Sequence, residues 1–332
     1  MNYIGSKLKL CGDFLPQTIF SICGDDLSEC TFCYIFAGTG IVGRTFKSKV
    51  KKIISNDIEY YSFVLNKNYI ENHRPIEDKT KYLDELNSIE LIDDGFIYKN
   101  YCLGGSGERQ YFSDYNGKMI DSARKKIESW FYNQRIGKEL YYFLLCSLLE
   151  SADKVANTAS VYGAYLKNLK KSARQKIIIQ GAEYEINENH HVVYQRDANE
   201  LIKEISGDIL YLDPPYNARQ YGANYHLLNT IAEYKPFVPK GKTGLREYTK
   251  SKYCSKSTVK EEFEFLIKNS KFKYIFLSYN NEGLMSVDDI ERIMSKYGRY
   301  DLAQTGYQRF KADSNRFNKS SSTIEYLHIL TK

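Results

Sequence analysis

The chain has 332 residues, and its 47 Lys and Arg against 41 Asp and Glu give a net charge of +6. Its 42% hydrophobic and 27% charged residues are ordinary values for a folded globular protein and argue against a disordered chain. Seven cysteines without a regular framework argue against a disulfide-rich secreted protein. Because no signal peptide and no apolar run of about 18 residues is visible, we expect a soluble cytoplasmic protein without a membrane segment.

The first predicted elements form a strand, a Gly-rich turn, a helix, a strand and a helix over residues 31–72. This alternation is typical of a βαβ unit and a parallel sheet. Residues 73–190 differ from it. They contain an exposed helix, a Gly-rich loop and two helices, which we expect at residues 73–90, 101–118, 119–134 and 137–155.

The β/α alternation resumes at residue 191. The predicted elements are a strand, a helix capped by Asp197, an apolar strand, a third strand, a helix and a last strand, at residues 191–197, 198–205, 208–212, 272–281, 286–298 and 322–330. The sequence therefore predicts an α/β fold with a Rossmann-like, doubly wound sheet. Residues 1–72 and 191–332 would form this domain, and residues 73–190 a mainly helical insertion.

Cys23, Cys30 and Cys33 could form a metal site, since Cys30 and Cys33 have the spacing of zinc ligands, but a structural zinc site needs a fourth ligand. The residues around them, 31–36, are also typical of a buried strand in which cysteine acts as a small hydrophobic side chain. The strand is the favoured interpretation, and no metal is expected.

The Gly-rich turn contains Gly38, Gly40 and Gly43 directly after a predicted strand and at the start of a predicted helix. In this context the glycines allow a tight turn and a close approach of the backbone to a ligand. Asp57 ends the next strand, where its carboxylate can accept hydrogen bonds from ribose hydroxyls. The pattern predicts a nucleoside cofactor, and both NAD(H) and S-adenosylmethionine bind such turns.

The second motif is Asp213-Pro214-Pro215-Tyr216 at the end of the apolar strand 208–212. The two prolines remove backbone donors and end the strand. The Asp213 carboxylate and the Pro214 carbonyl are thus left beside an aromatic ring at the carboxyl end of the strand, where open α/β sheets bind ligands. Two acceptors and a ring suit a planar group that carries an amine.

This DPPY sequence resembles the motif of the N6-adenine DNA methyltransferases of the Dam-like alpha group. In this family the cofactor motifs precede a target-recognition insertion, and DPPY follows it. Further segments are similar to family blocks in the same order: residues 2–7, 36–40, 152–167, 217–228, 277–284 and 309–316. Where the family usually has Trp or Phe next to the amino-terminal glycine pair, this sequence has Tyr3-Ile4-Gly5-Ser6.

The resemblance implies S-adenosylmethionine as cofactor, held by Tyr3, Lys7, Phe36, Gly38, Gly40, Asp57, Asp197 and Asp213. For Asp197 a role as a helix N-cap is an equally good interpretation and does not exclude cofactor contact. Lys7 fits a solvated surface lysine equally well. The insertion 73–190 would then be the target-recognition domain that binds DNA.

The residues of the DPPY turn explain how such a transfer would proceed. The Asp213 carboxylate and the Pro214 carbonyl would accept the two N6 hydrogens of adenine, so that the nitrogen lone pair faces the methyl group. Tyr216 would stack on an adenine flipped out of the duplex. The transfer would be direct, without a covalent enzyme intermediate.

Two segments, 151–180 and 238–260, concentrate the basic residues, as loops that follow a DNA backbone do. Any single lysine in them is better explained as a solvated side chain, whereas the two clusters taken together favour contact with a phosphate backbone. The candidates for DNA contact are Arg109, Lys154, Lys170, Lys171, Arg219, Lys240, Lys242 and Arg246.

The expected function is site-specific DNA adenine N6-methylation by a monomer or weak dimer. The enzyme would either act beside a restriction endonuclease with the same target site or be a solitary methylase. Two other classes stay open: an NAD-dependent oxidoreductase and a non-catalytic DNA-binding protein with a relic cofactor site. The target sequence is not predicted.

Overall fold

The computed structural model describes residues 6–308 and 322–332, and the chain divides into two compact units. The sheet unit consists of Gly5–Ile58, Asn187–Gln220 and Lys250–Lys332. The helical unit contains Glu59–Ile186 and Tyr221–Thr249. Each unit has its own hydrophobic core.

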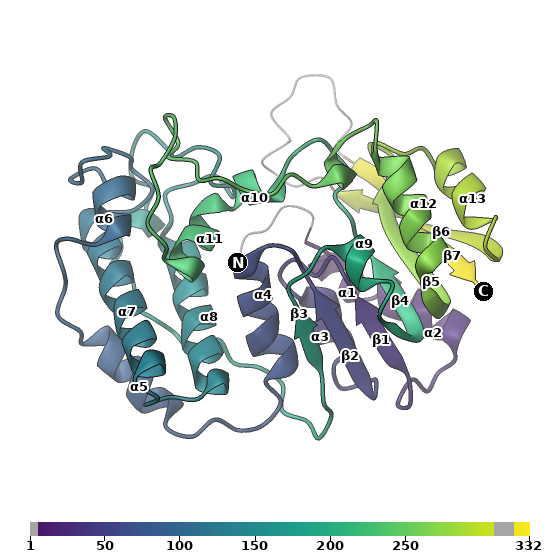
Figure 1. Cartoon of the computed structure of the whole chain (residues 1–332), viewed down its shortest axis with the longest axis horizontal. Helices are drawn as coiled ribbons and strands as arrows, with labels where there is room; N and C mark the ends of the chain where they lie inside the picture. Colours follow the sequence, from purple (N-terminus) through teal and green to yellow (C-terminus); the bar gives the residue numbers. More distant parts are fainter. Residues whose placement is uncertain (1–5, 309–321) are drawn as a thin grey trace. The chain divides into compact units, whose positions relative to one another are not determined.

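The sheet unit contains a seven-stranded sheet with the order β3-β2-β1-β4-β5-β7-β6 (Figure 1). The strands are β1 (Thr31–Tyr34), β2 (Lys52–Asn56), β3 (Val192–Tyr194), β4 (Ser206–Leu212), β5 (Lys271–Asn280), β6 (Arg299–Gln308) and β7 (Ser322–Thr331). The first five are parallel, whereas β7 lies antiparallel between β5 and β6. The predicted α/β class with a doubly wound sheet is confirmed.

Successive side chains of a strand point to opposite faces of the sheet, and they pack against helices on both faces. On one face, Phe32 of β1 stacks on Phe46 of α3 (Ile41–Phe46), with ring centroids 4.6 Å apart. On the other face, Leu210 and Leu212 of β4 belong to the core that includes Leu266 of α12 (Val259–Asn269). The helices of the unit are α1 (Leu8–Cys11), α2 (Phe14–Cys23), α3 (Ile41–Phe46), α9 (Ala198–Leu201), α12 (Val259–Asn269) and α13 (Val287–Met294), with a 3₁₀ turn at Lys252–Cys254.

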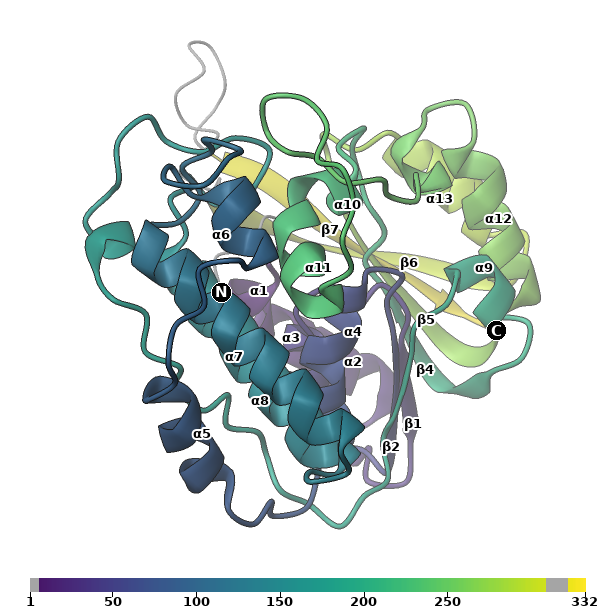
Figure 2. The same cartoon turned by 60° about the vertical axis from the view of Figure 1, so that its left-hand side comes forward.

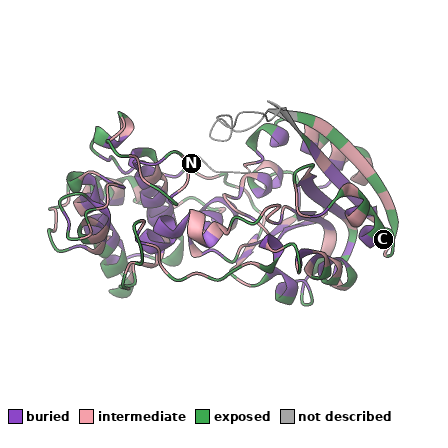
Figure 3. Cartoon of the chain, turned by 90° about the horizontal axis from the view of Figure 1, so that it is seen from above, coloured by how far each residue is buried: buried purple, intermediate pink, exposed green. Residues whose placement is uncertain are grey.

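The helical unit is built around α7 (Asp114–Tyr132) and α8 (Lys138–Val155), which pack against each other (Figure 2). Apolar residues at helical spacing form its core, including the predicted face of Leu140, Phe143, Leu144 and Leu148. The remaining helices are α4 (Tyr60–Asn66), α5 (Lys79–Asn87), α6 (Phe96–Tyr101), α10 (Tyr221–Asn224) and α11 (His226–Glu233), with a π-helical turn at Lys67–Glu71 and a 3₁₀ turn at Ser172–Arg174. In both units the buried residues gather in the interior (Figure 3).

Two buried charges of α7 hold the ends of neighbouring helices. The Asp121 carboxylate accepts hydrogen bonds from the backbone N–H groups of Ile97 and Tyr98 at the start of α6. The Arg124 guanidinium donates to the carbonyls of Ile231 and Ala232 near the end of α11. Helix ends leave such backbone groups without partners, and opposite charge is favourable there. These two side chains therefore fix α6 and α11 against α7.

The helical unit differs in extent from the predicted insertion 73–190. It begins at Glu59, so that α4 belongs to it, and it takes in the separate segment Tyr221–Thr249 with α10 and α11. Elements without a strong local signal, such as α1, α2, α12 and β6, were not predicted from the sequence. The helix predicted at 198–205 is confirmed in part, since α9 covers only Ala198–Leu201.

Two further features concern membranes and metals. In the part of the chain that the structure describes, every helix is too short or too polar to cross a bilayer. Among the same residues there is no group of three or more His, Cys, Asp and Glu side chains that could hold a metal ion. Cys33 is buried in β1, as the strand interpretation expects.

Candidate active site

The two sequence motifs meet at one edge of the sheet. Strands β1 and β4 are parallel neighbours, with Tyr34 opposite Tyr211. The turn after β1 carries Gly38, and the turn after β4 carries Asp213. The strand order also reverses between β1 and β4, and open α/β sheets bind their ligands at such a reversal.

The Gly-rich turn has the backbone conformation for which glycine is needed. Gly38 has a φ of 52° and Gly40 a φ of 77°, both in the left-handed region that is strained for other residues. The N–H of Gly38 donates a 2.7 Å hydrogen bond to the Asp57 carboxylate at the end of β2. The structure thus brings together Gly38 and Asp57, two residues that were predicted to bind the cofactor.

Asn56, which the sequence did not single out, joins the ends of three strands. Its Nδ2 donates to the carbonyls of Ile35 after β1 and of Arg196 after β3, at 3.1 and 3.0 Å. Its Oδ1 accepts the N–H of Arg196 at 2.9 Å. Because Asn56 is buried at the last position of β2, these bonds fix Asp57 and Asp197, which follow directly.

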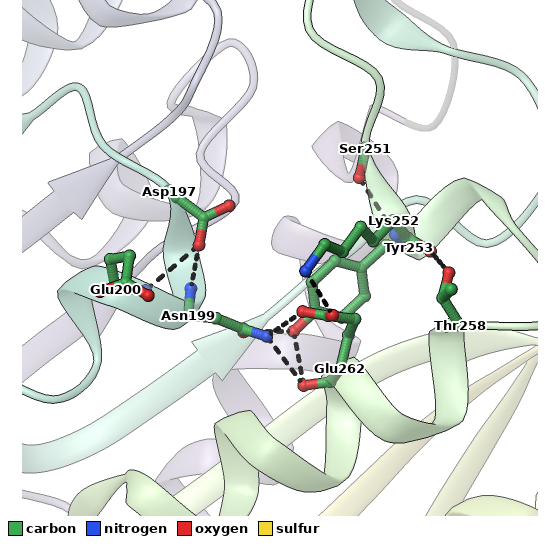
Figure 4. Close-up of polar contacts among 8 residues, drawn as sticks. All are labelled: Asp197, Asn199, Glu200, Ser251, Lys252, Tyr253, Thr258 and Glu262. Atoms are coloured by element: carbon green, nitrogen blue, oxygen red, sulfur yellow. Dashed lines mark hydrogen bonds and ion pairs between the residues drawn. The ribbon is translucent and has the colours of Figure 1, made fainter.

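Asp197 caps α9, as predicted: one carboxylate oxygen accepts the N–H groups of Asn199 and Glu200. Its other oxygen has no hydrogen bond among the described residues and points away from the helix (Figure 4). Next to it, Asn199 Nδ2 donates to the carbonyl and the carboxylate of Glu262. The cap therefore leaves one acceptor for a ligand.

Tyr253 is a second residue that the sequence did not single out. Its hydroxyl donates to Asn199 Oδ1 at 2.8 Å, which connects it to α9 (Figure 4). Its ring packs edge to face on Phe36 of the Gly-rich turn, with centroids 5.0 Å apart. Phe36, Tyr253 and the free oxygen of Asp197 together suit a planar ring with a polar edge.

The DPPY turn follows β4 and is supported from β5. The Tyr216 ring contacts Tyr279 edge to face, and the Tyr216 carbonyl accepts the N–H of Leu284 at 2.9 Å. Gly283 lies so close to the Tyr279 ring that a Cβ there would be 2.0 Å from a ring carbon. Only glycine fits this approach, so the loop after β5 holds the turn in place.

Asp213 belongs to a group of three charges, of which Lys7 and Glu325 are buried and Asp213 is half-buried. Lys7 Nζ lies 3.2 Å from Asp213 Oδ1 and 2.6 Å from Glu325 Oε1 of β7. The side chains of Lys7, Asp213 and Glu325 are 5%, 15% and 7% exposed. Lys7 Nζ also lies 5.9 Å from the centre of the Tyr216 ring. The predicted residue Lys7 thus contacts the DPPY turn.

Burial changes the protonation of this group. It raises the pKa of Asp213 to about 6, and the negative charge of Glu325 acts in the same direction, whereas the Lys7 ammonium opposes the rise. The pKa of Lys7 is itself well above its usual value, because the attraction of Asp213 and Glu325 outweighs its desolvation. At neutral pH the carboxylate is therefore largely ionised and able to accept hydrogen bonds.

The predicted DNA-binding residues lie in both units, and most have partners within the protein. Arg109 donates to the carbonyls of Asn100, Gly241 and Lys242. Such contacts fasten a turn and leave little of the guanidinium for a base. The pairs Lys154–Gln180, Lys170–Thr158, Lys240–Glu247 and Arg246–Glu233 are also formed.

Lys171 and Lys242 are exposed and have no ion pair among the described residues. Arg219 is exposed and belongs to the sheet unit, directly after the DPPY turn. The predicted basic segment 238–260 is divided between the units, because the helical unit ends at Thr249. Tyr3, a predicted cofactor residue, and the block 309–316 lie outside the described residues.

Comparison with known proteins gives the family. Residues 3–293 match the model of the D12 class N6 adenine-specific DNA methyltransferases. The chain is 61% identical to Type II methyltransferase M.NlaIII of Neisseria lactamica over 334 residues, which is 100% of this chain and 99% of the relative. Type II methyltransferase M.CviAII of Paramecium bursaria Chlorella virus 1 is 38% identical over 94% of this chain and 93% of the relative. Type II methyltransferase M.FokI of Planomicrobium okeanokoites is 37% identical, and there the chain covers 53% of the relative.

The match spans both the glycine turn and the DPPY turn and accounts for them together. An oxidoreductase would explain the glycine turn but not the DPPY turn. The predicted resemblance to N6-adenine DNA methyltransferases is therefore confirmed, and so is the predicted Rossmann-like methyltransferase fold. The chain therefore belongs to the D12 class of N6 adenine-specific DNA methyltransferases.

Proposed function

We propose that the protein transfers the methyl group of S-adenosylmethionine to N6 of an adenine that is flipped out of duplex DNA. The observation that carries this proposal is the position of Asp213. Its carboxylate lies at the carboxyl end of β4, is 15% exposed, and contacts Lys7 through Oδ1. Oδ2 has no hydrogen bond among the described residues, so it is free to accept one from an amine.

The residues around the glycine turn fit S-adenosylmethionine by their chemistry. Asp57 is suited to ribose hydroxyls, and the free oxygen of Asp197 to a polar edge of the adenine ring. Phe36 offers aromatic surface for that ring, and the buried Tyr253 packs against Phe36 and supports it. The cofactor supplies an electrophilic methyl group on a sulfonium. The role of the protein is to bind it so that this methyl group faces the DPPY turn.

The DPPY turn would orient the target amine. We assign Asp213 and the Pro214 carbonyl as acceptors of the two N6 hydrogens, Pro215 as the residue that makes the turn rigid, and Tyr216 as the ring that stacks on the base. The amine of adenine is a weak nucleophile because its lone pair is delocalised into the ring. Two fixed acceptors favour the conformation in which the lone pair can attack.

The helical unit and the basic loops would bind the DNA. The candidates for phosphate or base contact are Lys154, Lys170, Lys171, Arg219, Lys240, Lys242 and Arg246. For Arg109 the three backbone contacts support a different role, the positioning of the turn at residues 241–244. Since the relatives named above are Type II methyltransferases, we further propose that the protein is the modification enzyme of a restriction system.

The proposal is tested by transfer of a labelled methyl group from S-adenosylmethionine to unmethylated DNA, followed by sequencing of the methylated positions. Wild-type protein is expected to produce N6-methyladenine in one sequence context, and Asp213→Asn to lower kcat by at least about a thousandfold, because the charged acceptor is lost. Asp208→Asn, a change at the other end of β4, is the matched control. Full activity of Asp213→Asn would contradict the proposed role of the turn.

A further inference from the structure

The Lys7 ammonium does not contact its two carboxylates, the buried Glu325 and the half-buried Asp213, equally. Glu325 has the shorter contact with the Lys7 ammonium, 2.6 Å against 3.2 Å for Asp213. The Ser278 hydroxyl donates a 2.9 Å hydrogen bond to the same oxygen of Glu325. Ser278 and Glu325 lie on the paired strands β5 and β7, so the position of this carboxylate is fixed by the sheet.

The number of charges also matters. One ammonium faces two carboxylates, which leaves a net charge of −1 on the group. A buried ammonium needs an anionic partner, and Asp213 alone would be enough to neutralise it. In that case the Asp213 carboxylate would be committed to Lys7 and would be a weaker acceptor for any other donor. With Glu325 present, the ammonium is held mainly by a residue that is 7% exposed, and the more exposed Asp213 keeps its negative charge.

We propose that Glu325 is a positioning residue, which binds the Lys7 ammonium and thereby keeps the Asp213 carboxylate available as the acceptor for the target amine. This inference rests on the proposed function of Asp213. It assigns a role in the reaction to β7, a strand that carries neither the glycine motif nor DPPY. Ser278 supports the same arrangement through its hydrogen bond to Glu325.

Glu325→Gln is the decisive variant, because it keeps the size and an acceptor for Ser278 but removes the charge. Lys7 then pairs with Asp213 alone. We expect kcat to fall by about tenfold to a hundredfold, the range for one charged hydrogen bond, while KM for DNA and for cofactor stays within about twofold. A merely structural role of Glu325 would reduce the amount of folded protein without this separation of kcat from KM.

The pH profile gives a second readout. The titratable groups that face Asp213 and Lys7 are Glu325 of β7, Cys11 of α1, Tyr34 of β1, Tyr211 of β4 and Tyr216 of the DPPY turn. Since Glu325 raises the pKa of Asp213, Glu325→Gln should move the acid limb of the kcat profile to lower pH, although kcat itself is lower. Lys7→Met should move the limb to higher pH.

Two measurements complete the test. In the Lys7→Met background, Glu325→Gln should cause no further loss of kcat, because the residue acts through Lys7. The carboxyl pKa of Asp213, measured by ¹³C NMR in the cofactor-free protein, should be lower in Glu325→Gln than in wild type. The matched control is Glu264→Gln, which removes a carboxylate that pairs with Lys296 at 2.7 Å in the same unit and should leave kcat and the pH profile unchanged.

The inference is overturned if Glu325→Gln has the kcat and acid limb of wild type, or if its loss of kcat is equally large in the Lys7→Met background. Failure of the proposed function looks different, since wild-type protein would then produce no N6-methyladenine at all.

Discussion

The two units use buried charge in different ways. In the helical unit, Asp121 and Arg124 are surrounded by backbone groups of helix ends and by polar side chains, and their hydrogen-bonding capacity is used within the protein. In the sheet unit, Lys7, Asp213 and Glu325 neutralise one another incompletely and leave Asp213 with an acceptor. Buried charges of the first kind hold a fold together, whereas those of the second kind are available for a ligand.

Asp121→Ala should cause the largest loss of stability. It removes the acceptor of two N–H groups of α6 and of the Tyr234 hydroxyl, and we expect the free energy of unfolding to fall by about 3 kcal/mol, while the folded protein keeps its specific activity. Urea unfolding and methylation assays on the same samples measure both. Asp93→Ala, which removes an exposed partner of Lys118, serves as control. A stable but inactive Asp121→Ala protein would contradict the view that the buried charges of the helical unit serve the fold and not the reaction.

Asp213→Asn should show the opposite behaviour, because it is expected to stabilise the fold. The folded-state pKa of about 6 lies above the ordinary value of 3.8, so the favourable contribution of Asp213 is complete below pH 3.8 and is lost as the pH rises through 6. Relative to wild type, the variant should therefore be more stable by about 3 kcal/mol at pH 7 and equally stable below about pH 4.

Unfolding curves from pH 4 to pH 8 measure this difference. The control with the opposite sign is Asp289→Asn, because Lys260 and other partners lower the pKa of Asp289. That variant should be less stable than wild type at pH 7, and the free energies of unfolding of the two proteins should become equal in acid. A pH-independent effect of Asp213→Asn would contradict the assigned protonation of the site.

Tyr253→Phe tests whether the network of Figure 4 supports the cofactor site. The change removes the hydroxyl that bonds to Asn199 and to the Glu262 carbonyl but keeps the ring on Phe36. We expect the affinity for S-adenosylmethionine, measured by calorimetry, to fall by about fivefold, which is about 1 kcal/mol, with kcat unchanged. Tyr297→Phe, which removes a hydroxyl bonded to Glu264, should leave the affinity as it is.

The smallest effects are expected from the unpaired lysines. Lys171→Ala and Lys242→Ala should each weaken DNA binding about equally for all sequences and reduce the slope of log K against log salt by about one. Fluorescence anisotropy at several salt concentrations gives this slope. Lys49→Ala is the control, since Lys49 lies between α3 and β2 at the opposite, amino-terminal edge of the sheet. An unchanged slope in both variants would place the DNA elsewhere.

The parts of the site that could be predicted from sequence are those set by local conformation. Glycines with positive φ, a proline pair at a strand end and an N-cap aspartate each leave a signal within a few residues, and Gly38, Asp213 and Asp197 lie where these signals indicate. These residues lie at the same edge of the sheet because the strands before them are parallel, so that their carboxyl ends meet there. The assignment of these residues to cofactor and substrate stays a prediction.

The residues that were missed depend on tertiary structure. Asn56 acts because β1 and β3 both pair with β2, and Tyr253 because its loop returns to α9. Glu325 contacts Lys7 only because β7 inserts beside β5. No sequence motif connects these positions, because none of the three residues stands out from its neighbours in the chain. The extent of the helical unit was missed for the same reason, as α4 and α11 pack on α8 from distant parts of the chain.

The ion pair between Lys7 and Glu325 joins residues 318 positions apart and therefore has a consequence for biosynthesis. At a translation rate of about 5–20 residues per second, Lys7 leaves the ribosome roughly 15–60 s before Glu325 is made. Throughout this interval the amino-terminal segment lacks one of its two anionic partners, and β5 lacks its neighbour β7. The finished arrangement around Asp213 therefore has to wait for the last strand, so chains that end before β7 should modify DNA less well than the full chain.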